Sequence, residues 1–503
     1  MAQPSVAELA SAAAQAEEPG FVTPAKTNFG GVDPLGLRQI NFDLMDEVLR
    51  GLNNVARHVR PFVVVTWAWR RALQLAKGTD ARSTELQDFV DRIEVLYVLS
   101  QIVLDKTADL PGSQYLARWL DEPELTFGGP KWKKRRTERA GSTALSAPVN
   151  YGPGLKMLGW LGPHPNRPGI LLPAPEVSPA LESLEVALRP VLKRAAFSTL
   201  GSVTVKRKEL KRWGELWALN AVTRAEADVM SKLLIGANAP LSRRLGMDLM
   251  FAASSHTKKT DPAVLRAAMA GPPAKFAPRR GELLETREKW RRLQMRQLFR
   301  LSLESLFYWM MLNLEGPPRS IETLVGAFLK LLPPRGNLKA GNWMHRQAPA
   351  DLGPTELMER IREACLAANQ RDLARDITLG LALCLKEAEA SDPRPQQPER
   401  LPLARAQKEV AARAQDSIPE MMRHVMESWV LAQHAYWAVH RGLADARAGG
   451  RTLLRLRIIL DEGGWTLTPG APLREAPRPT PDRLETAITL AKECRLFERA
   501  KAS

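Results

Sequence analysis

The longest helical pattern in the sequence runs from Glu285 to Glu315 and changes character halfway along. Its first half carries arginine and lysine side chains around Trp290, Leu293 and Leu298, whereas the stretch from Leu306 to Leu312 is apolar on every side. A helix that is apolar all round must be covered by other elements. The pattern therefore predicts a helix that begins at a basic surface and ends inside a bundle.

Helical periodicity recurs along most of the 503 residues, and stretches rich in glycine and proline separate the helical segments. Single cores stop growing near 250–300 residues, so two or three domains are expected. The sequence predicts a mainly α, multi-domain protein. The predicted units are a disordered tail (1–27), an N-terminal helical domain (28–126), a basic Gly/Pro-rich connector (127–180), a central helical domain (181–390), a linker (391–402) and a C-terminal helical domain (403–503).

The C-terminal domain contains a pattern that is typical of strands. The run from Leu453 to Leu460 alternates in part between apolar and polar residues, and a glycine-rich turn lies between it and the segment Trp465 to Leu467. Two such segments around a short turn favour a β-hairpin. We therefore expect a small C-terminal hairpin beside the helices.

The segment from 28 to 71 is strongly punctuated near the start of the chain. A turn signal from Asp33 to Gly36 precedes a helical pattern that Gly51 ends. The apolar block that follows, from Phe62 to Trp69, is too short to span a bilayer, which needs about 20 apolar residues. Helical signals continue beyond this block and favour a buried helix, although its β-branched residues are equally compatible with a short buried strand.

The spacing in this segment resembles the N-terminal signature of a bacterial family with no assigned activity, which often sits beside helicases and nucleases in phage-defence gene neighbourhoods. The signature reads Asp-x-Leu-Gly-Leu-x-x-Ile, then a leucine pair and Gly, then Arg, an aromatic residue, an apolar run and Trp. Its key positions here are Asp33, Gly36, Gly51, Arg60 and Trp67. The resemblance implies a part in antiviral defence, with a helicase or nuclease as partner protein.

The charge balance of the chain points to an anionic partner. The formal net charge is +17 and the isoelectric point is near 10.0. A basic excess of this size most often indicates nucleic acid. The alternatives are a basic protein that is merely soluble and one whose charge meets an acidic subunit. We expect nucleic acid, with DNA favoured over RNA.

Three basic segments supply the candidate nucleic-acid-binding residues, and together they could form one groove. In the first segment a tryptophan could stack on a base while its neighbours lie on phosphates. A solvated loop and ordinary solvated helix faces are the alternatives. The candidates are Lys131, Trp132, Lys133, Lys134, Arg135, Arg136 and Arg139 in the first segment, Lys206, Arg207, Lys208, Lys211 and Arg212 in the second, and Arg287, Arg291, Arg292 and Arg296 in the third. The same groove could also include Arg57, Arg60, Arg70 and Arg71. The alternative role for Arg60 is to support the turn at Asp33.

The sequence contains none of the common catalytic signatures. It lacks a phosphate loop, a dinucleotide fingerprint and a nucleophile elbow. The cysteines Cys365, Cys384 and Cys494 are too far apart for a zinc set, and the histidines between 424 and 440 do not share a helix face. We expect no catalytic residue, cofactor, metal or membrane span. The isolated cysteines and the absence of a signal-peptide pattern favour the cytoplasm.

The function that these patterns favour is that of a non-catalytic, nucleic-acid-binding accessory component of a bacterial antiviral defence complex. The defence assignment comes from the resemblance, and the nucleic-acid assignment comes from the charge. Two alternatives remain open: a scaffold subunit that docks an acidic helicase or nuclease, and a nuclease effector without a recognisable motif.

Overall fold

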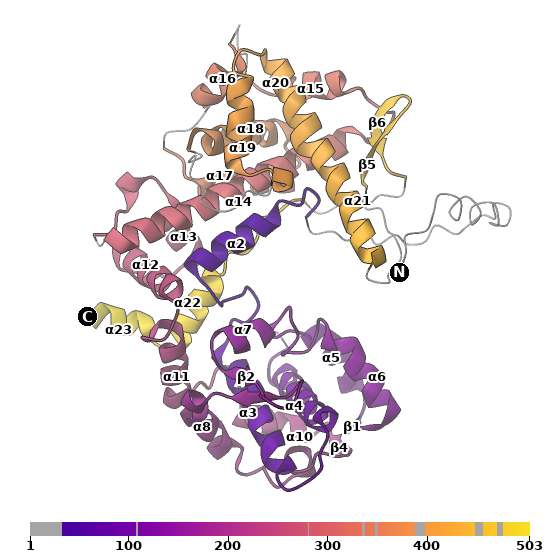
Figure 1. The fold of residues 1–503 in the computed structure, drawn as a ribbon, viewed down its shortest axis with the longest axis vertical. Coiled ribbons are helices and arrows are strands. Elements are labelled where there is room, and N and C mark those ends of the chain that lie inside the picture. Colours follow the sequence, from indigo (N-terminus) through magenta and orange to yellow (C-terminus); the bar gives the residue numbers. More distant parts are fainter. Residues whose placement is uncertain are drawn as a thin grey trace, which may run out of the picture.

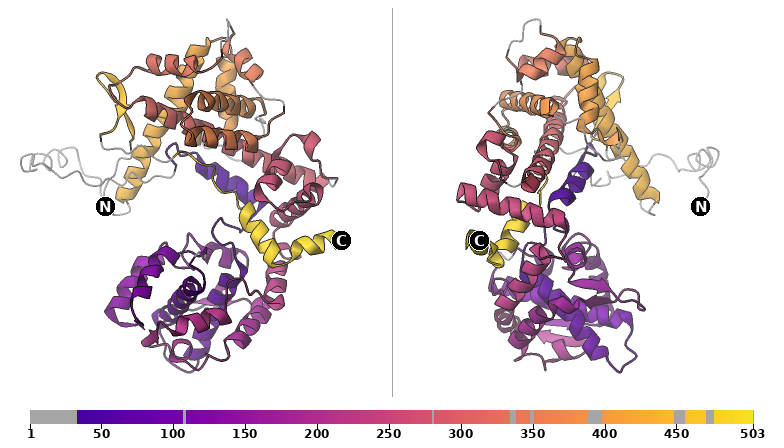
Figure 2. Two further views of the ribbon diagram at one scale, coloured as in Figure 1. Left: turned by 180° about the vertical axis from the view of Figure 1, so that it is seen from behind. Right: turned by 60° about the vertical axis from the view of Figure 1, so that its left-hand side comes forward.

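The computed structural model describes residues 33–106, 109–279, 281–333, 338–347, 351–387, 398–447, 456–469 and 476–502. Figure 1 shows two helical lobes, and the views in Figure 2 show the same lobes from other sides. The described chain is mainly α, as the periodicity predicts, and its strands form three two-stranded antiparallel sheets. The predicted tail 1–27 and most of the predicted linker 391–402 lie outside the described residues.

The elements fall into three groups. The first lobe, drawn at the bottom of Figure 1, contains α3 (Val59–Ala76), α4 (Ser83–Leu104), α5 (Ser113–Ala117), η1 (Arg118–Asp121), β1 (Glu124–Phe127), α6 (Gly129–Ala140), α7 (Tyr151–Met157), β2 (Leu161–Pro163), β3 (Leu171–Pro173), η2 (Pro175–Val177), α8 (Ser178–Leu188), α9 (Ala195–Ser198), β4 (Val203–Lys206), α10 (Glu209–Leu216) and α11 (Arg224–Ile235). The group that joins the lobes contains α2 (Arg38–Val48), α12 (Leu241–Thr257), α13 (Pro262–Ala270), η3 (Pro273–Lys275), α14 (Gly281–Asn313), α22 (Leu484–Glu493) and α23 (Leu496–Ala502). The second lobe contains α15 (Ile321–Lys330), α16 (Ala340–Gln347), α17 (Pro354–Leu366), α18 (Gln370–Glu387), η4 (Pro398–Arg400), α19 (Leu403–Ala412), α20 (Ile418–His424), the π-helix η5 (Val425–Leu431), α21 (Ala432–Arg447), β5 (Ile458–Asp461) and β6 (Gly464–Leu467).

Helix α14 passes through both hydrophobic cores of the protein. Trp290 and Leu293 in its first half belong to the core of the first lobe, whereas Leu306 and Trp309 in its second half belong to the core of the second. Trp309 is fully buried and packs edge-on against the ring of Phe328, with 5.0 Å between ring centroids. The prediction that this helix ends inside a bundle is confirmed. The predicted C-terminal hairpin is also present, as β5 and β6.

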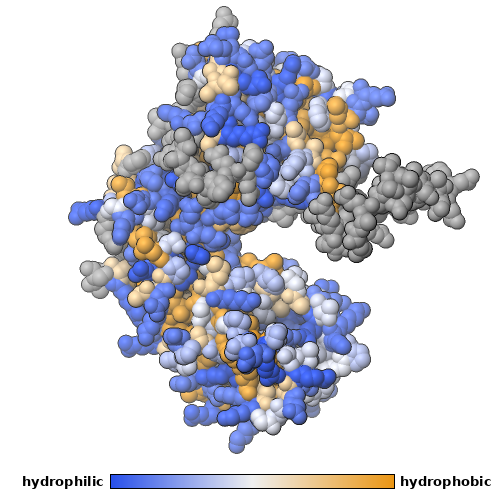
Figure 3. Space-filling model, viewed as in Figure 1, coloured by the Kyte–Doolittle hydropathy of each residue, from blue (hydrophilic) through white to orange (hydrophobic). Residues whose placement is uncertain are grey.

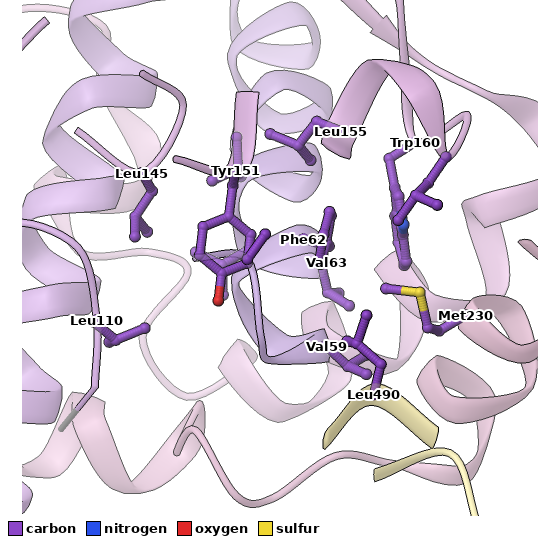
Figure 4. Packing of buried hydrophobic residues seen from close by; sticks show 14 of the residues in the cluster. Val59, Phe62, Val63, Leu110, Leu145, Tyr151, Leu155, Trp160, Met230 and Leu490 are labelled. Carbon is purple, nitrogen blue, oxygen red and sulfur yellow. The ribbon is translucent and has the colours of Figure 1, made fainter. Parts of the chain in front are cut away.

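The apolar block with the β-branched residues folds as helix α3 and forms the centre of the first core. Its residues are buried on all sides, so the helix shows no exposed face from which a period could be read. Figure 4 shows how Phe62 of this helix lies against Tyr151 and Trp160. The centroid distances are 4.9 Å to Tyr151 and 6.0 Å to Trp160. Leu490 of α22 reaches the same core from the far end of the sequence.

The cores do not follow the predicted domain divisions. Residues 127–180, predicted as a connector, form α6, α7, β2 and β3 and supply Trp132 and Tyr151 to the first core. Helix α22, predicted to belong to a C-terminal domain, also packs there, and its Glu493 accepts a hydrogen bond of 2.7 Å from the backbone N–H of Val59. The glycines and prolines of the connector form tight turns between short packed elements, which the composition alone does not distinguish from an open linker.

The turn before α2 attaches this helix to the second lobe. The Asp33 carboxylate accepts hydrogen bonds from the backbone N–H groups of Leu37 (2.9 Å) and Arg38 (3.1 Å) at the start of α2. The same carboxylate pairs with Arg441 of α21 at 3.3 Å. Nearby, the carbonyl of Pro34 lies 3.0 Å from Nδ1 of His434, whose pKa burial lowers to about 4, so the imidazole is neutral. These contacts close a junction between segments about 400 positions apart.

The other signature residues also have structural contacts. Arg60 does not support the turn at Asp33; it forms a buried ion pair of 3.1 Å with Glu226. Trp67 is buried against Phe197, with 6.3 Å between ring centroids. Gly51 ends the segment after α2 with a φ of +85°, in the left-handed region that favours glycine.

A comparison of two glycines tests how tightly the turn from Asp33 to Gly36 is packed against α21. Gly36 has a φ of +69°, and a Cβ there would lie 2.3 Å from the indole of Trp437. Gly78 has a φ of +76°, and a Cβ there would meet nothing within 4 Å. Left-handed backbone costs either alanine variant about 1–2 kcal/mol, whereas the steric overlap adds about 1–3 kcal/mol to Gly36→Ala alone. Thermal melts should therefore show a larger loss for Gly36→Ala than for Gly78→Ala. Equal losses would contradict the close contact with Trp437.

Candidate nucleic-acid interface

The first basic segment is a helix, where the sequence indicated a loop. It forms α6, which follows directly after strand β1. Pro130 occupies the first turn of this helix, where a fixed φ and a missing N–H are tolerated. Lysine and arginine are good helix formers, and no glycine or proline interrupts the residues from 131 to 140. The basic side chains are therefore held on a rigid element and divided between two faces.

The inner face of α6 is buried, and Trp132 lies on it. Trp132 is 3% exposed and packs edge-on against Phe127 and Trp119, at centroid distances of 5.0 Å and 6.3 Å. Arg135 covers the outer side of Trp119, with its guanidinium carbon 4.2 Å from the ring centroid. The predicted stacking of the Trp132 indole on a base is not compatible with this position. The composition indicated an exposed tryptophan because it could not show which face of the helix packs inward.

Two further arginines of the first segment are paired with helix α4. Arg136 donates a hydrogen bond of 2.6 Å to Asp88, and the fully buried Arg139 pairs with Asp91 at 3.0 Å. These ion pairs fix α6 against α4 and occupy the cations on that side. Lys133 and Lys134 point away from this contact, are exposed, and have no ion-pair partner among the described residues.

The second basic segment lies beside the first because β1 pairs with β4. In this antiparallel ribbon Glu124 stands opposite Lys206. The backbone N–H of Arg207 donates to the carbonyl of Pro123 at 3.0 Å, and its guanidinium donates to the carbonyl of Leu120 at 2.5 Å. Arg207 therefore joins the second segment to the short stretch that precedes β1.

Glu122 joins the first segment to that same stretch. It accepts hydrogen bonds from Lys131 (3.0 Å) and Arg135 (2.5 Å). These bonds, first from Arg135 and then from Lys131, lower the pKa of the Glu122 carboxyl. Both basic segments thus contact residues 120–124, so the structure brings two of the three predicted segments together.

The rest of the second segment is presented to solvent by the turn at Lys208 and by helix α10. Its inner face carries Leu210 and Trp213, which are buried, and Trp213 packs against Phe197 at 4.9 Å between ring centroids. Figure 3 shows hydrophilic residues along the side of the lower lobe where Figure 1 places α6. The exposed cations of the two segments, termed the basic patch, are Lys131, Lys133, Lys134, Lys206, Arg207, Lys208, Lys211 and Arg212.

The third predicted segment is not part of this surface. Arg287 is fully buried and donates a hydrogen bond of 2.6 Å to the carbonyl of Gly271, and Arg291 donates to the carbonyl of Ala270. Both carbonyls lie at the C-terminal end of α13. Arg296 is buried and donates to the carbonyl of Leu401 at 2.7 Å, while Arg292 is half-buried on the same helix. The prediction of a nucleic-acid-binding face here is wrong for the buried arginines, because neighbouring elements cover the helix.

The remaining candidate arginines are also engaged in contacts within the protein. Arg70 pairs with Glu185 at 2.5 Å, and Arg57 lies 3.4 Å from Glu485. Arg71 donates a hydrogen bond of 3.0 Å to the carbonyl of Phe197. They do not extend the basic patch.

No protein-family model, curated protein or solved structure matches this chain. The described part of the chain contains no group of three or more His, Cys, Asp or Glu side chains placed to hold a metal ion. Within the same residues, every helix is too short or too polar to cross a bilayer. The interpretation of this protein accordingly begins from two features of its structure, the two-lobed helical fold and the basic patch on the first lobe.

Replacement of Trp132 tests whether its indole is a packing residue of the first core. Because the indole is buried among aromatic rings, Trp132→Ala should lower the free energy of unfolding by about 3–5 kcal/mol. Lys133→Ala, one position along and exposed, should stay within about 0.5 kcal/mol of the parent. Denaturation curves of both variants check this expectation. A Trp132→Ala protein as stable as the parent would contradict the buried position of the indole.

Proposed function

We propose that this protein is a non-catalytic, nucleic-acid-binding accessory component of a bacterial antiviral defence complex, and that its basic patch contacts the phosphates of DNA. The observation that carries the proposal is the β1–β4 ribbon, which holds two basic segments together on one lobe. Their exposed lysines lie on α6, at the end of β4, in the two-residue turn that follows it, and on α10. A rigid set of cations suits the regularly spaced charges of a nucleic-acid backbone.

The chemistry of the patch favours contact with phosphates over contact with bases. Most of its members are lysines, which act as point charges toward phosphate oxygens. The neighbouring rings of Trp119, Trp132 and Phe127 are buried against one another, and the half-buried Tyr115 donates its hydroxyl hydrogen bond to Glu138 of α6. Binding through such a surface depends on counterion release and is independent of sequence. This arrangement supports double-stranded DNA as the partner.

The defence role in the proposal is supported by the resemblance of the segment that contains Asp33, Gly36, Gly51, Arg60 and Trp67 to the phage-defence-associated family. In such a complex a helicase or nuclease would supply the chemistry, and this protein would hold the DNA. The same patch also fits an acidic surface of that partner protein, which is the competing function.

Charge removal from the patch tests the proposal. We consider a variant in which Lys133, Lys134, Lys208 and Lys211 are all replaced by Gln. If each lysine contacts one phosphate, the slope of log affinity against log salt concentration for duplex DNA should become shallower by about 3–4, at about 0.9 per phosphate. Fluorescence anisotropy with a labelled duplex at several salt concentrations measures this slope.

A matched variant controls for the overall loss of charge. Lys330, Arg371, Lys386 and Lys408 are exposed on the second lobe, and their replacement by Gln removes the same four charges. This variant should keep a salt slope close to that of the parent. Equal slopes for both variants, or no binding of the parent to duplex DNA, would reject the patch as a DNA-binding surface and favour docking of an acidic protein.

A further inference from the structure

Glu122 is held at the basic patch by two cations of helix α6. Its Oε1 accepts hydrogen bonds from Lys131 at 3.0 Å and from Arg135 at 2.5 Å, and its Oε2 lies 3.5 Å from the other terminal nitrogen of Arg135. Lys131 and Arg135 are four positions apart, so their side chains lie on one face of the helix. A forked guanidinium and an ammonium group bind a phosphate as they bind a carboxylate. The protein therefore already holds an anion at this position.

The surroundings of Glu122 keep this position in shape without its carboxylate. The guanidinium carbon of Arg135 lies 4.2 Å from the ring centroid of the buried Trp119, and this contact does not involve Glu122. The backbone is fixed as well, because Arg207 donates to backbone carbonyls on either side of Glu122. Only the Glu122 side chain has to move for another anion to enter.

Lys131 differs from the other cations around it in two respects. Its side chain is 69% exposed, whereas that of Arg135 is 18% exposed, so the position opens to solvent on the Lys131 side. Lys131 is also the one cation of the basic patch that forms an ion pair within the described chain. By contrast, the carboxylate of Asp91 pairs with Arg139, which is fully buried and out of reach of a partner molecule.

We propose that Lys131 and Arg135 form a phosphate site of the basic patch, which Glu122 occupies in the free protein and a DNA phosphate takes over on binding. This inference rests on the proposed function, because it requires duplex DNA on the patch. Lys133 and Lys134 are exposed on the same helix and bring the DNA backbone to it. Partly exposed ion pairs are weak and screened by salt, so a phosphate delivered in this way displaces the Glu122 carboxylate. Glu122 thereby lowers the affinity for DNA and promotes its release.

A double-mutant cycle on the full chain tests this competition. The affinity for a labelled duplex is measured by fluorescence anisotropy at one fixed salt concentration. Glu122→Gln should raise the affinity about three- to fivefold, which corresponds to the strength of a partly exposed ion pair. Lys131→Gln should lower it. In the presence of Lys131→Gln, the gain from Glu122→Gln should fall below about twofold, because the more exposed of the two released cations is then absent.

Thermal melts of each variant confirm that it is folded. An unchanged affinity in Glu122→Gln would overturn the inference. A gain of the same size with and without Lys131 would overturn it as well, because Glu122 would then act through the general field of the protein and not through this site.

A matched variant controls for the lost negative charge. Asp121 is the neighbouring residue, is exposed and has no ion-pair partner among the described residues. Asp121→Asn should change the affinity by less than about twofold, because this charge is screened and occupies no cation site. Equal gains in Asp121→Asn and Glu122→Gln would contradict a specific site.

The same titrations separate this inference from the proposed function. If the parent binds the duplex and Glu122→Gln gives no gain, the phosphate site is wrong and the basic patch remains the DNA-binding surface. If neither the parent nor Glu122→Gln binds the duplex, the proposed function is wrong, and the phosphate site is rejected together with it.

Discussion

A buried guanidinium group must replace its lost hydration with hydrogen bonds, and this requirement shapes much of the protein. Some buried arginines, such as Arg60 and Arg139, meet it with carboxylates. Others meet it with backbone carbonyls at the ends of helices, where the carbonyls carry partial negative charge. Arg243 donates to the carbonyls of Leu233 and Leu234 at the end of α11. Arg287 donates to Gly271 after α13 in the same way. These bonds satisfy carbonyl groups that have no partner within their own helices.

The same arginines join parts of the chain that are far apart in the sequence. Arg243 also donates to the carbonyl of Arg50 at 2.9 Å, and Arg300 of α14 donates to the carbonyl of Arg478 at 2.7 Å. Burial lowers the pKa of Arg92 and of Arg243 to about 10, so both remain charged at neutral pH. Part of the net charge of +17 is therefore structural. The charge that is available to a partner is therefore smaller than +17. The exposed cations of the basic patch belong to this available charge.

The sequence predicts the helical class, the C-terminal hairpin and the buried end of α14 well, because these follow from local periodicity and turn residues. It does not predict the domain divisions, because contacts such as that of Glu493 with Val59 join the two ends of the chain. It also does not show that Trp132 and Arg287 are buried, because composition cannot separate the faces of a covered helix. The full burial of Glu94 was also missed, although its place between Ile93 and Val95 is a usable signal for a buried polar group.

The central claim of this account is that the exposed cations of α6 and α10 contact DNA, whereas the buried arginines of α14 only hold the fold together. Hydrogen–deuterium exchange of the full chain with and without a saturating DNA duplex tests both parts in one measurement. The account predicts slower exchange in residues 129–140 and 203–216, and unchanged exchange in residues 287–300. Protection of residues 287–300, or no change in residues 129–140 and 203–216 under conditions where the duplex is bound, would contradict it.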